Sequence, residues 1–560
     1  MSTAESKSPA PVTSEPYRPD NHVRIVTAAS LFDGHDAAIN VMRRILQSSG
    51  AEVIHLGHNR AVKEIVDCAI QEDAQGIAIT SYQGGHVEYL KYMYDLLKEA
   101  GAPIKIFAGG GGTILTTEIE ELHAYGIDRI YSPDDGRAMG LQGMINDLLQ
   151  RCDFPVAEPP PEAALTDLRK KDPKVLGRLI SIAENDPTAF AALSAKLGKV
   201  VDARVSPVLG ITGTGGAGKS SMVDELVRRF LTDFGDKHVA IISIDPSKRR
   251  TGGALLGDRI RMNSIDNDRV YMRSLATRQS NLAMSKHVRS AIEVCKAAGF
   301  DLVIVETSGI GQSDTEITDH SDVSLYVMTA EYGAATQLEK IDMLDFADVI
   351  AINKFDKRGS LDALRDVRKQ YKRNHQKFDA KDEALPIFGT IASQFGDPGT
   401  NNLYRKLVDV LAERTSAPLD SSMEITDAMS EKRFVIPPER VRYLAEISEQ
   451  SDAYDRFVDE QASLARQAYQ LRGTLEVLRQ GDEPDYAKDL VARYDEIWSR
   501  LHHDSRQVID GWDALVARYK AEKYQFKVRD RVIEQDLYTE SLSHLKIPKV
   551  VLPRYKDCVV

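Results

Sequence analysis

The sequence predicts an α/β protein with two doubly wound parallel sheets, followed by an α-helical region. In residues 23–150, short Ile- and Val-rich runs alternate with amphipathic runs of helical period, and the same alternation recurs in residues 205–415. Continuous apolar runs are typical of parallel strands buried on both faces of a sheet. From residue 430 to 545 the sequence is charged and helical in period, which predicts the helical region.

The first sheet is predicted to contain five strands, each followed by a helix. The apolar runs place the strands at residues 22–30, 51–57, 76–81, 104–110 and 128–132. The helical runs lie at residues 35–50, 61–73, 86–101, 117–126 and 140–150. Five such units predict a flavodoxin-like sheet of order 2-1-3-4-5, with a ligand at the carboxyl ends of strands 1 and 3.

Changes in composition divide the chain into five segments. We expect a disordered tail at residues 1–20, a ligand-binding domain at 21–152, a linker with helices at 153–204, a nucleotide-binding domain at 205–415 and a helical linker region at 416–560. The tail is polar and rich in Pro and Ser, and three consecutive prolines stiffen the linker at residues 159–161.

Charge and cysteine content exclude several classes of partner. The net charge of −12 argues against binding to nucleic acid or to an anionic membrane, because both require a positive field. The sequence has no apolar run long enough to span a membrane and no signal peptide. Four scattered cysteines show no metal-ligand spacing, so we expect a reduced, cytoplasmic protein.

A phosphate-binding loop is predicted in "VLGITGTGGAGKSSMVDELVRRF", residues 208–230. The segment matches GxxxxGK[ST] between an apolar strand and an amphipathic helix, which is the context that this motif requires. Lys219 is expected to reach the β- and γ-phosphates as a catalytic residue, and the Ser220 hydroxyl is expected to hold Mg²⁺. The backbone N–H groups that would surround the phosphates belong to Gly215, Gly216, Ala217 and Gly218.

Two further strands of this domain end in acidic residues. Asp245 ends the strand at residues 238–245, and Glu306 ends the strand at residues 300–306. Because an acid at a strand tip beside a phosphate-binding loop can bind Mg²⁺, both are candidate magnesium ligands, and Glu306 is also a candidate catalytic residue. Gly309 follows and can donate its N–H to a γ-phosphate.

The segment "NKFD" predicts that the nucleotide carries guanine. Asn353, Lys354 and Asp356 form an NKxD sequence at the end of another buried strand. A carboxylate at Asp356 would accept two hydrogen bonds from guanine, whereas adenine would present a lone pair to it. We therefore expect GTP rather than ATP as the substrate.

Taken together, these motifs resemble the metallochaperone GTPases that serve cobalamin mutases, of the methylmalonyl-CoA mutase chaperone type. The segment "DPSKRRTGGALLGDRIRM", residues 245–262, is similar to that family's loop. The resemblance implies that Asp258 belongs to the Mg²⁺ shell and that Arg261 lies near the phosphates. No residue is clearly placed to orient the attacking water, so we expect slow intrinsic hydrolysis.

The loops after strands 1, 3 and 4 of the first sheet are "FDGHDAA", "TSYQGGH" and "AGGGG". Their glycines let the backbone approach a bulky ligand, and Asp33 is spaced to orient the ring of His35. The loops resemble the cobalamin-binding signature DxHxxG … SxL … GG, although Ala38 and Gln83 depart from it. The resemblance implies base-off binding, with His35 as the lower ligand to cobalt. The cofactor-binding residues that it implies are Asp33, His35, Ser81, Gly109 and Gly110.

The order of the two domains resembles the fused isobutyryl-CoA mutases over residues 20–560. That family implies adenosylcobalamin and Mg²⁺ as cofactors, GTP as substrate, and a GTPase that gates cofactor loading. It also implies conversion of isobutyryl-CoA to n-butyryl-CoA in a barrel, which needs about 250 residues and is not in this chain. We expect the acyl-CoA to bind through that barrel, supplied by a longer chain or a separate subunit, and the long helical segment favours a homodimer.

Three alternatives stay open at the level of sequence. The chain could be a stand-alone corrinoid chaperone GTPase that delivers cobalamin to a partner mutase. It could be a corrinoid methyl carrier, although a fused GTPase argues against methyl transfer. It could also be a GTP-dependent regulator with a degenerate flavodoxin-like domain.

Overall fold

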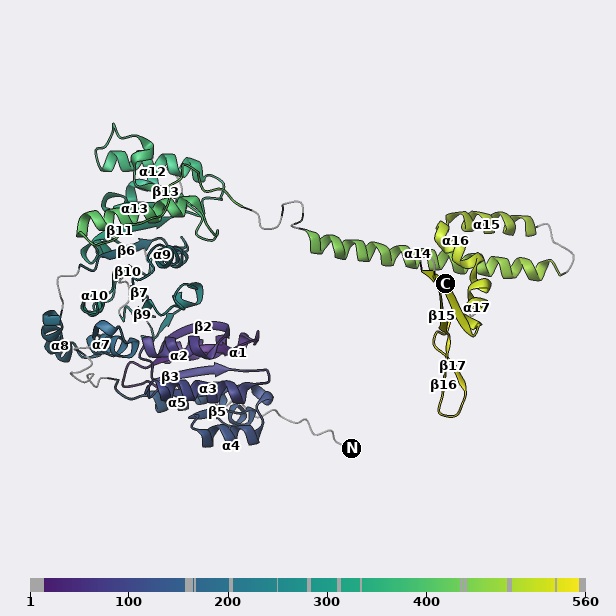
Figure 1. Ribbon diagram of the computed structural model, residues 1–560, viewed down its shortest axis with the longest axis horizontal. Coiled ribbons are helices and arrows are strands. Elements are labelled where there is room, and N and C mark those ends of the chain that lie inside the picture. The colour runs from purple at the N-terminus through teal and green to yellow at the C-terminus, as the bar shows by residue number, and fades with distance from the viewer. Residues whose placement is uncertain are drawn as a thin grey trace, which may run out of the picture. The chain divides into compact units, whose positions relative to one another are not determined.

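The computed structural model shows two compact units, one within residues 1–433 and the other within residues 434–560 (Figure 1). The structure describes residues 15–156, 165, 168–200, 205–248, 250–278, 284–309, 314–332, 335–433, 437, 440, 442–480, 486–528 and 531–552. The predicted disordered tail at residues 1–20 lies largely outside this set.

The first unit begins with the predicted parallel sheet. Its own strands are β1 (Arg24–Ser30), β2 (Glu52–Arg60), β3 (Gly76–Thr80), β4 (Lys105–Gly109) and β5 (Arg129–Tyr131). Their spatial order is β5-β4-β3-β1-β2, which confirms the predicted order. All residues of β1 are buried, as the continuous apolar run predicts.

Helices cover both faces of this sheet. They are α1 (Ala37–Ser48), α2 (Val62–Gln71), α3 (His86–Glu99), α4 (Thr116–Tyr125) and α5 (Pro133–Cys152). One core packs Ile65 of α2, Met93 of α3 and Leu122 of α4 on one face. The other packs Leu46 of α1 and Leu148 of α5 on the opposite face. Gly140, at φ 68°, breaks the helical path inside α5.

A second parallel sheet follows two linker helices, α7 (Pro173–Asn185) and α8 (Pro187–Val200). Its order is β13-β12-β11-β6-β10-β7-β9. The strands are β6 (Val208–Gly213), β7 (Val239–Asp245), β9 (Val270–Ala276), β10 (Leu302–Glu306), β11 (Val323–Met328), β12 (Val349–Asn353) and β13 (Ile387–Thr390). Its helices are α9 (Lys219–Asp233), α10 (Val288–Ala297), α11 (Met343–Phe346), α12 (Ser360–Asn374) and α13 (Pro398–Thr415). These two sheets confirm the α/β fold class.

The loop between β7 and β9 forms a strand in the other domain's sheet. Strand β8 (Ala254–Leu256) pairs in parallel with β2, so the first sheet has six strands, in the order β5-β4-β3-β1-β2-β8. Sequence analysis assigned this segment to a loop of the nucleotide-binding domain. A run of three residues carries too little periodicity to indicate a strand on its own.

The second unit begins with helices and ends in hairpins. The helices are α14 (Tyr443–Leu478), α15 (Ala487–Arg500), α16 (His503–Asp510) and α17 (Trp512–Lys520). Antiparallel pairs then form between β14 (Lys523–Val528) and β15 (Arg531–Asp536), and between β16 (Tyr538–Glu540) and β17 (Lys546–Pro548). The prediction of helix up to residue 545 is therefore wrong for residues 523–528 and 531–545. The segment "KYQFKV" alternates polar with aromatic or β-branched residues, and "RVIEQD" contains the β-branched pair Val532 and Ile533, which favours strands.

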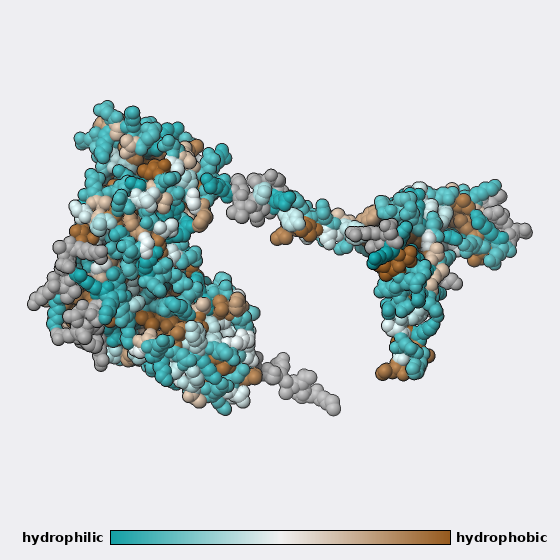
Figure 2. All heavy atoms as spheres, viewed as in Figure 1, coloured by the Kyte–Doolittle hydropathy of each residue, from teal (hydrophilic) through white to brown (hydrophobic). Residues whose placement is uncertain are grey.

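Large apolar side chains lie exposed along the helices of the second unit. They include Leu444, Ile447, Val458 and Val477, all on α14, and Figure 2 shows brown surface on this unit. Among the described residues no helix combines the length and apolar character needed to cross a membrane.

Candidate functional site

The carboxyl ends of β1 and β3 bring the first set of predicted residues together. Asp33 is buried, and its Oδ1 accepts hydrogen bonds from Nδ1 of His35 at 2.8 Å and from the His35 backbone N–H at 2.9 Å. Its Oδ2 accepts the backbone N–H of Tyr82 at 2.7 Å. The His35 side chain is 74% exposed. Asp33 thus holds both the backbone and the ring of His35, and the ring is exposed to solvent.

The charge of Asp33 fixes the tautomer of His35. Burial raises the pKa of the Asp33 carboxyl, but hydrogen bonds from the N–H groups of Tyr82 and His35 outweigh it, and the net pKa is below the ordinary value. An ionised carboxylate only accepts hydrogen bonds, so Nδ1 of His35 carries the proton. Nε2 is then the nitrogen with a lone pair available to a metal.

A cavity of about 240 Å³ opens at the same end of the sheet. Side chains of α1, β4 and α5 make its wall mainly apolar, and the loop after β4 contributes glycines. A Cβ at Gly110 would lie 1.9 Å from the Ser81 carbonyl oxygen, so only glycine fits there. The Ser81 N–H donates to the Gly109 carbonyl at 3.0 Å, and its buried Oγ accepts from Ser30 Oγ at 2.9 Å.

The phosphate-binding loop follows β6 and leads into α9. Gly216 and Gly218, at φ 76° and 91°, adopt left-handed backbone conformations that turn the loop. Lys219 is buried, and its Nζ donates to the carbonyl oxygens of Gly213 at 3.0 Å and Thr214 at 3.3 Å. A Cβ at Gly309 would lie 2.1 Å from that Nζ. Gly309 therefore lies beside Lys219.

Acidic side chains converge on Ser220. Its Oγ lies 3.1 Å from Asp258 Oδ1 and 2.8 Å from Glu306 Oε1, and Ser243 Oγ donates to Asp258 Oδ2. Asp245 accepts the Gly257 N–H at 3.2 Å. Burial and the nearby Asp258 raise the pKa of Asp245 to about 8 and raise the pKa of Glu306 well above its ordinary value.

Asp258 and Glu306 both lie within hydrogen-bond distance of Ser220, so a divalent ion bound there would offset the repulsion between their carboxylates. No described group of three or more His, Cys, Asp or Glu side chains is spaced to hold a metal unaided.

Two side chains at the end of β12 donate hydrogen bonds to the phosphate-binding loop. Asn353 Nδ2 donates to the Ala217 carbonyl at 2.8 Å, and Lys354 Nζ donates to the Gly216 carbonyl at 2.7 Å. Asp356 and Arg261 are exposed, and neither makes a side-chain hydrogen bond to the loop in the part of the chain described here. The Asp356 carboxylate is thus exposed and can accept hydrogen bonds from a nucleotide base.

Several residues at these sites were missed by the sequence analysis. One is Ala392, in the loop after β13, whose N–H donates to Asn353 Oδ1 at 3.0 Å. The Tyr82 ring lies 5.5 Å from that of His35. Ser243, on β7, contacts Asp258. None of these positions carries a motif, and only the serine at a strand tip beside an acidic residue offered a weak signal.

Comparisons with known proteins identify the two domains. A family model described as "B12 binding domain" matches residues 23–139. A model described as "Methylmalonyl Co-A mutase-associated GTPase MeaB" matches residues 176–411. The chain therefore combines a B12-binding domain with a GTPase domain of the MeaB type, as predicted.

Whole-chain relatives carry both domains in one protein. The chain is 54% identical over 554 residues to the fused isobutyryl-CoA mutase of Geobacillus kaustophilus, covering 97% of this chain and 50% of that protein. It is 51% identical over 563 residues to the fused isobutyryl-CoA mutase of Cupriavidus metallidurans, covering 99% and 50%. The chain is homologous to the fused isobutyryl-CoA mutases along nearly its whole length, and it spans about half the length of these relatives.

Proposed function

We propose that this chain binds adenosylcobalamin in its first domain and hydrolyses Mg²⁺-bound GTP in its second. The GTPase would gate the loading of the cofactor. The observation that carries the proposal is the exposed His35, oriented by buried Asp33 beside an apolar cavity, in the same chain as a complete phosphate-binding loop.

His35 would be the lower ligand to cobalt through Nε2. Asp33 accepts the Nδ1 hydrogen bond, which leaves Nε2 for cobalt, and holds the ring in one orientation. The apolar cavity next to it, with Gly109 and Gly110 in its wall, would take the nucleotide tail that His35 displaces. When bound, the cofactor supplies a cobalt–carbon bond that can break homolytically.

In the GTPase domain each residue has a separate task. Lys219 would leave its two carbonyl partners and neutralise the β- and γ-phosphates, while the N–H of Gly309 donates to the γ-phosphate. Ser220 and Asp258 would hold Mg²⁺, with Asp245 and Glu306 completing its shell directly or through water. Asp356 would select guanine.

The rest of the proposed function depends on the half of the related proteins that this chain does not cover. We infer that the chain acts as a homodimer in the cytoplasm, together with a substrate barrel that holds an acyl-CoA. The activity of the whole would be the isomerisation of isobutyryl-CoA to n-butyryl-CoA. The homology over half of the fused mutases supports this placement.

An absorbance spectrum of the protein with added adenosylcobalamin tests the cofactor half. We expect the base-off, His-bound spectrum, and we expect His35→Ala to lose it because no other side chain replaces Nε2. The exposed neighbour Asp36→Asn is the matched control and should bind as wild type does. A wild-type protein without this spectrum would contradict the proposal.

Competition between nucleotides tests the GTPase half. With Mg²⁺ present, GTP should bind more tightly than ATP, and Asp356→Ala should reduce that preference because the guanine N1–H and amine lose their acceptor. Addition of GTP to the cobalamin-loaded protein should change the rate of cofactor exchange. An ATP preference in the wild type would overturn the assignment.

A further inference from the structure

The loop that carries Asp258 is anchored in the cobalamin domain. Strand β8, just before Asp258, pairs with β2 through Glu52 with Ala254 and Ile54 with Leu256. The approach is close, because a Cβ at Gly253 would lie 2.1 Å from the Gln47 carbonyl oxygen. The backbone on the amino-terminal side of Asp258 is therefore fixed by a sheet outside the GTPase domain.

The residue after Asp258 is anchored in the same domain by its side chain. Arg259 lies in the short 3-10 helix Asp258–Arg261 and is 5% exposed. Its Nε donates to Glu72 Oε1 at 2.9 Å, and its Nη2 donates to Gln71 Oε1 at 3.0 Å. Glu72 ends α2 in the cobalamin domain. Asp258 thus lies between two attachments to that domain.

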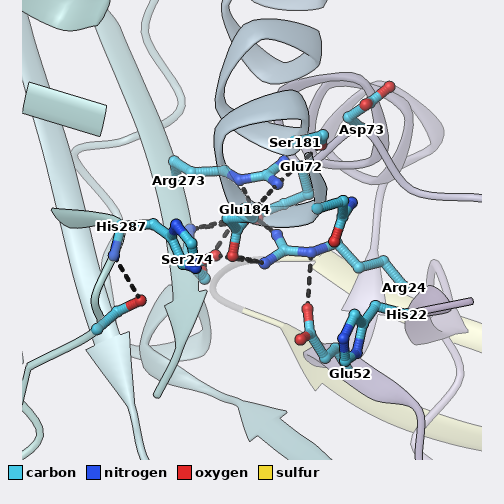
Figure 3. Close-up of polar contacts among 12 residues, drawn as sticks. His22, Arg24, Glu52, Glu72, Asp73, Ser181, Glu184, Arg273, Ser274 and His287 are labelled. Atoms are coloured by element: carbon cyan, nitrogen blue, oxygen red, sulfur yellow. Dashed lines mark hydrogen bonds and ion pairs between the residues drawn. The ribbon is translucent and has the colours of Figure 1, made fainter. Parts of the chain in front are cut away.

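Glu72 is itself fully buried and held from both domains. Arg24 of β1 donates to its Oε2 at 2.9 Å, and the N–H and hydroxyl of Ser274 on β9 donate to its Oε1 at 3.0 and 2.9 Å (Figure 3). Buried, fully hydrogen-bonded charged groups are rigid, because any movement leaves a charge without its partner. Glu72 is therefore a fixed point for Arg259.

We infer that Glu72 is a positioning residue for the magnesium site of the GTPase. It holds Arg259, and through Arg259 it keeps the Asp258 carboxylate beside Ser220, so the cobalamin domain completes a metal site in its neighbour. The inference rests on the proposed function, in which Ser220 and Asp258 bind Mg²⁺. It assigns to Glu72 a role in metal binding that involves no contact with the metal or the nucleotide.

The test measures metal affinity in the full chain, with Mn²⁺ as the probe. Glu72→Gln keeps the shape of the side chain and removes its charge. We expect Mn²⁺ to bind the GDP complex of this variant about 10–100-fold more weakly than that of the wild type, which is the usual effect of losing a residue that orients a metal ligand. Free Mn²⁺ is measured by electron paramagnetic resonance. Affinity for GDP in EDTA should stay unchanged, and saturating Mg²⁺ should restore most of the GTP hydrolysis rate.

The matched control is Glu64→Gln on the same helix. Glu64 pairs with Arg60 at 3.7 Å inside the cobalamin domain, so its loss should leave Mn²⁺ affinity as in the wild type. Unchanged Mn²⁺ affinity in folded Glu72→Gln overturns the inference. An equal loss of GDP affinity in EDTA also overturns it, because the whole nucleotide site would then be disturbed.

A second variant covers the case in which Glu72→Gln does not fold. Arg259→Lys keeps the charge facing Glu72 and removes the second donor group, so a smaller weakening of Mn²⁺ binding is expected, and none would overturn the inference. A wild-type chain that fails to bind Mn²⁺ and GDP would contradict the proposed function itself. If the wild type binds Mn²⁺ and GDP and the variants bind Mn²⁺ equally well, only the role of Glu72 is contradicted.

Discussion

Asp33 accepts three hydrogen bonds, and each has a different consequence for the loops at the carboxyl ends of β1 and β3. The bond from Nδ1 of His35 sets the tautomer, the bond from the His35 backbone fixes the loop after β1, and the bond from Tyr82 ties that loop to the end of β3. One buried carboxylate therefore couples ring orientation to loop position. A merely surface-exposed histidine would have neither constraint.

The substitution Asp33→Asn tests this coupling. An asparagine has one acceptor oxygen and one donor group, so at least one of the three N–H groups that face Asp33 would meet another donor. We expect cobalamin affinity to fall about 10–100-fold in an absorbance titration, with His35 still present. An affinity equal to that of wild type would show that His35 needs no orienting partner.

Residues with local motifs could be predicted from the sequence, and residues with long-range partners could not. Lys219 and Ser220 were found because their spacing belongs to one strand–loop–helix unit, and Gly309 was found because it follows the buried strand that ends in Glu306. Glu72 and Arg259 were missed, since they meet across 187 positions of the chain. Neither has a neighbour in sequence that signals a buried ion pair.

At the scale of the element, β8 is the least predictable part of the fold. The strands β1 to β5 each contain an apolar run followed by a helix, and their order follows from that repetition. Strand β8 has only three residues, with Ala254 and Leu256 buried. Its pairing depends on the exposed edge of β2, which no pattern inside residues 245–262 reveals.

The substitution Gly253→Ala tests whether β8 holds the loop that carries Asp258. The added methyl would meet the carbonyl oxygens of Gln47 and Ala51, which are backbone atoms and cannot turn away. We expect β8 to separate from β2, with faster amide hydrogen exchange at residues 254–256 measured by mass spectrometry. Gly257→Ala in the same loop meets nothing within 4 Å and serves as the control. Equal exchange in both variants would contradict this account of the loop.

At the scale of the whole first unit, buried ion pairs join three segments that lie far apart in the chain. Arg24 of the cobalamin domain contacts Glu52 at 2.9 Å and Glu184 of the linker helix α7 at 3.3 Å (Figure 3). Arg273 of the GTPase domain contacts Glu184 at 2.7 Å, and Arg278 contacts Glu52 at 2.7 Å. The linker helix is therefore part of the junction between the two domains.

This junction predicts a loss of stability in acid. Burial raises the pKa values of Glu52 and Glu184, but their arginine partners outweigh it and lower both pKa values below the ordinary one. Their contribution is fully present above the unfolded-state pKa of about 4.3 and is lost as the pH falls through and below it. Urea unfolding followed by circular dichroism should therefore show a larger difference in midpoint between the wild type and Glu184→Gln at pH 7 than at pH 4, because the Asp245 and Glu306 carboxyls, whose pKa values are raised, are common to both proteins.

A variant and an internal control accompany that measurement. Glu184→Gln should be destabilised at pH 7, by about 3–5 kcal/mol, because it leaves buried arginines without a partner. Both tryptophans, Trp498 and Trp512, lie in the second unit, so their fluorescence follows that unit separately. A midpoint difference between wild type and Glu184→Gln that is the same at pH 4 and pH 7 would contradict the role of these ion pairs.

The shared sheet also has a consequence for synthesis of the chain. Residues 52–54 of β2 emerge from the ribosome roughly 200 residues before their partners at 254–256. Until then their N–H and C=O groups form an open strand edge, which can template pairing with any other chain. In a crowded polysome the segment 254–256 of one copy can complete the sheet of another, giving a domain-swapped dimer. Misassembly of this protein is thus expected to start at β2.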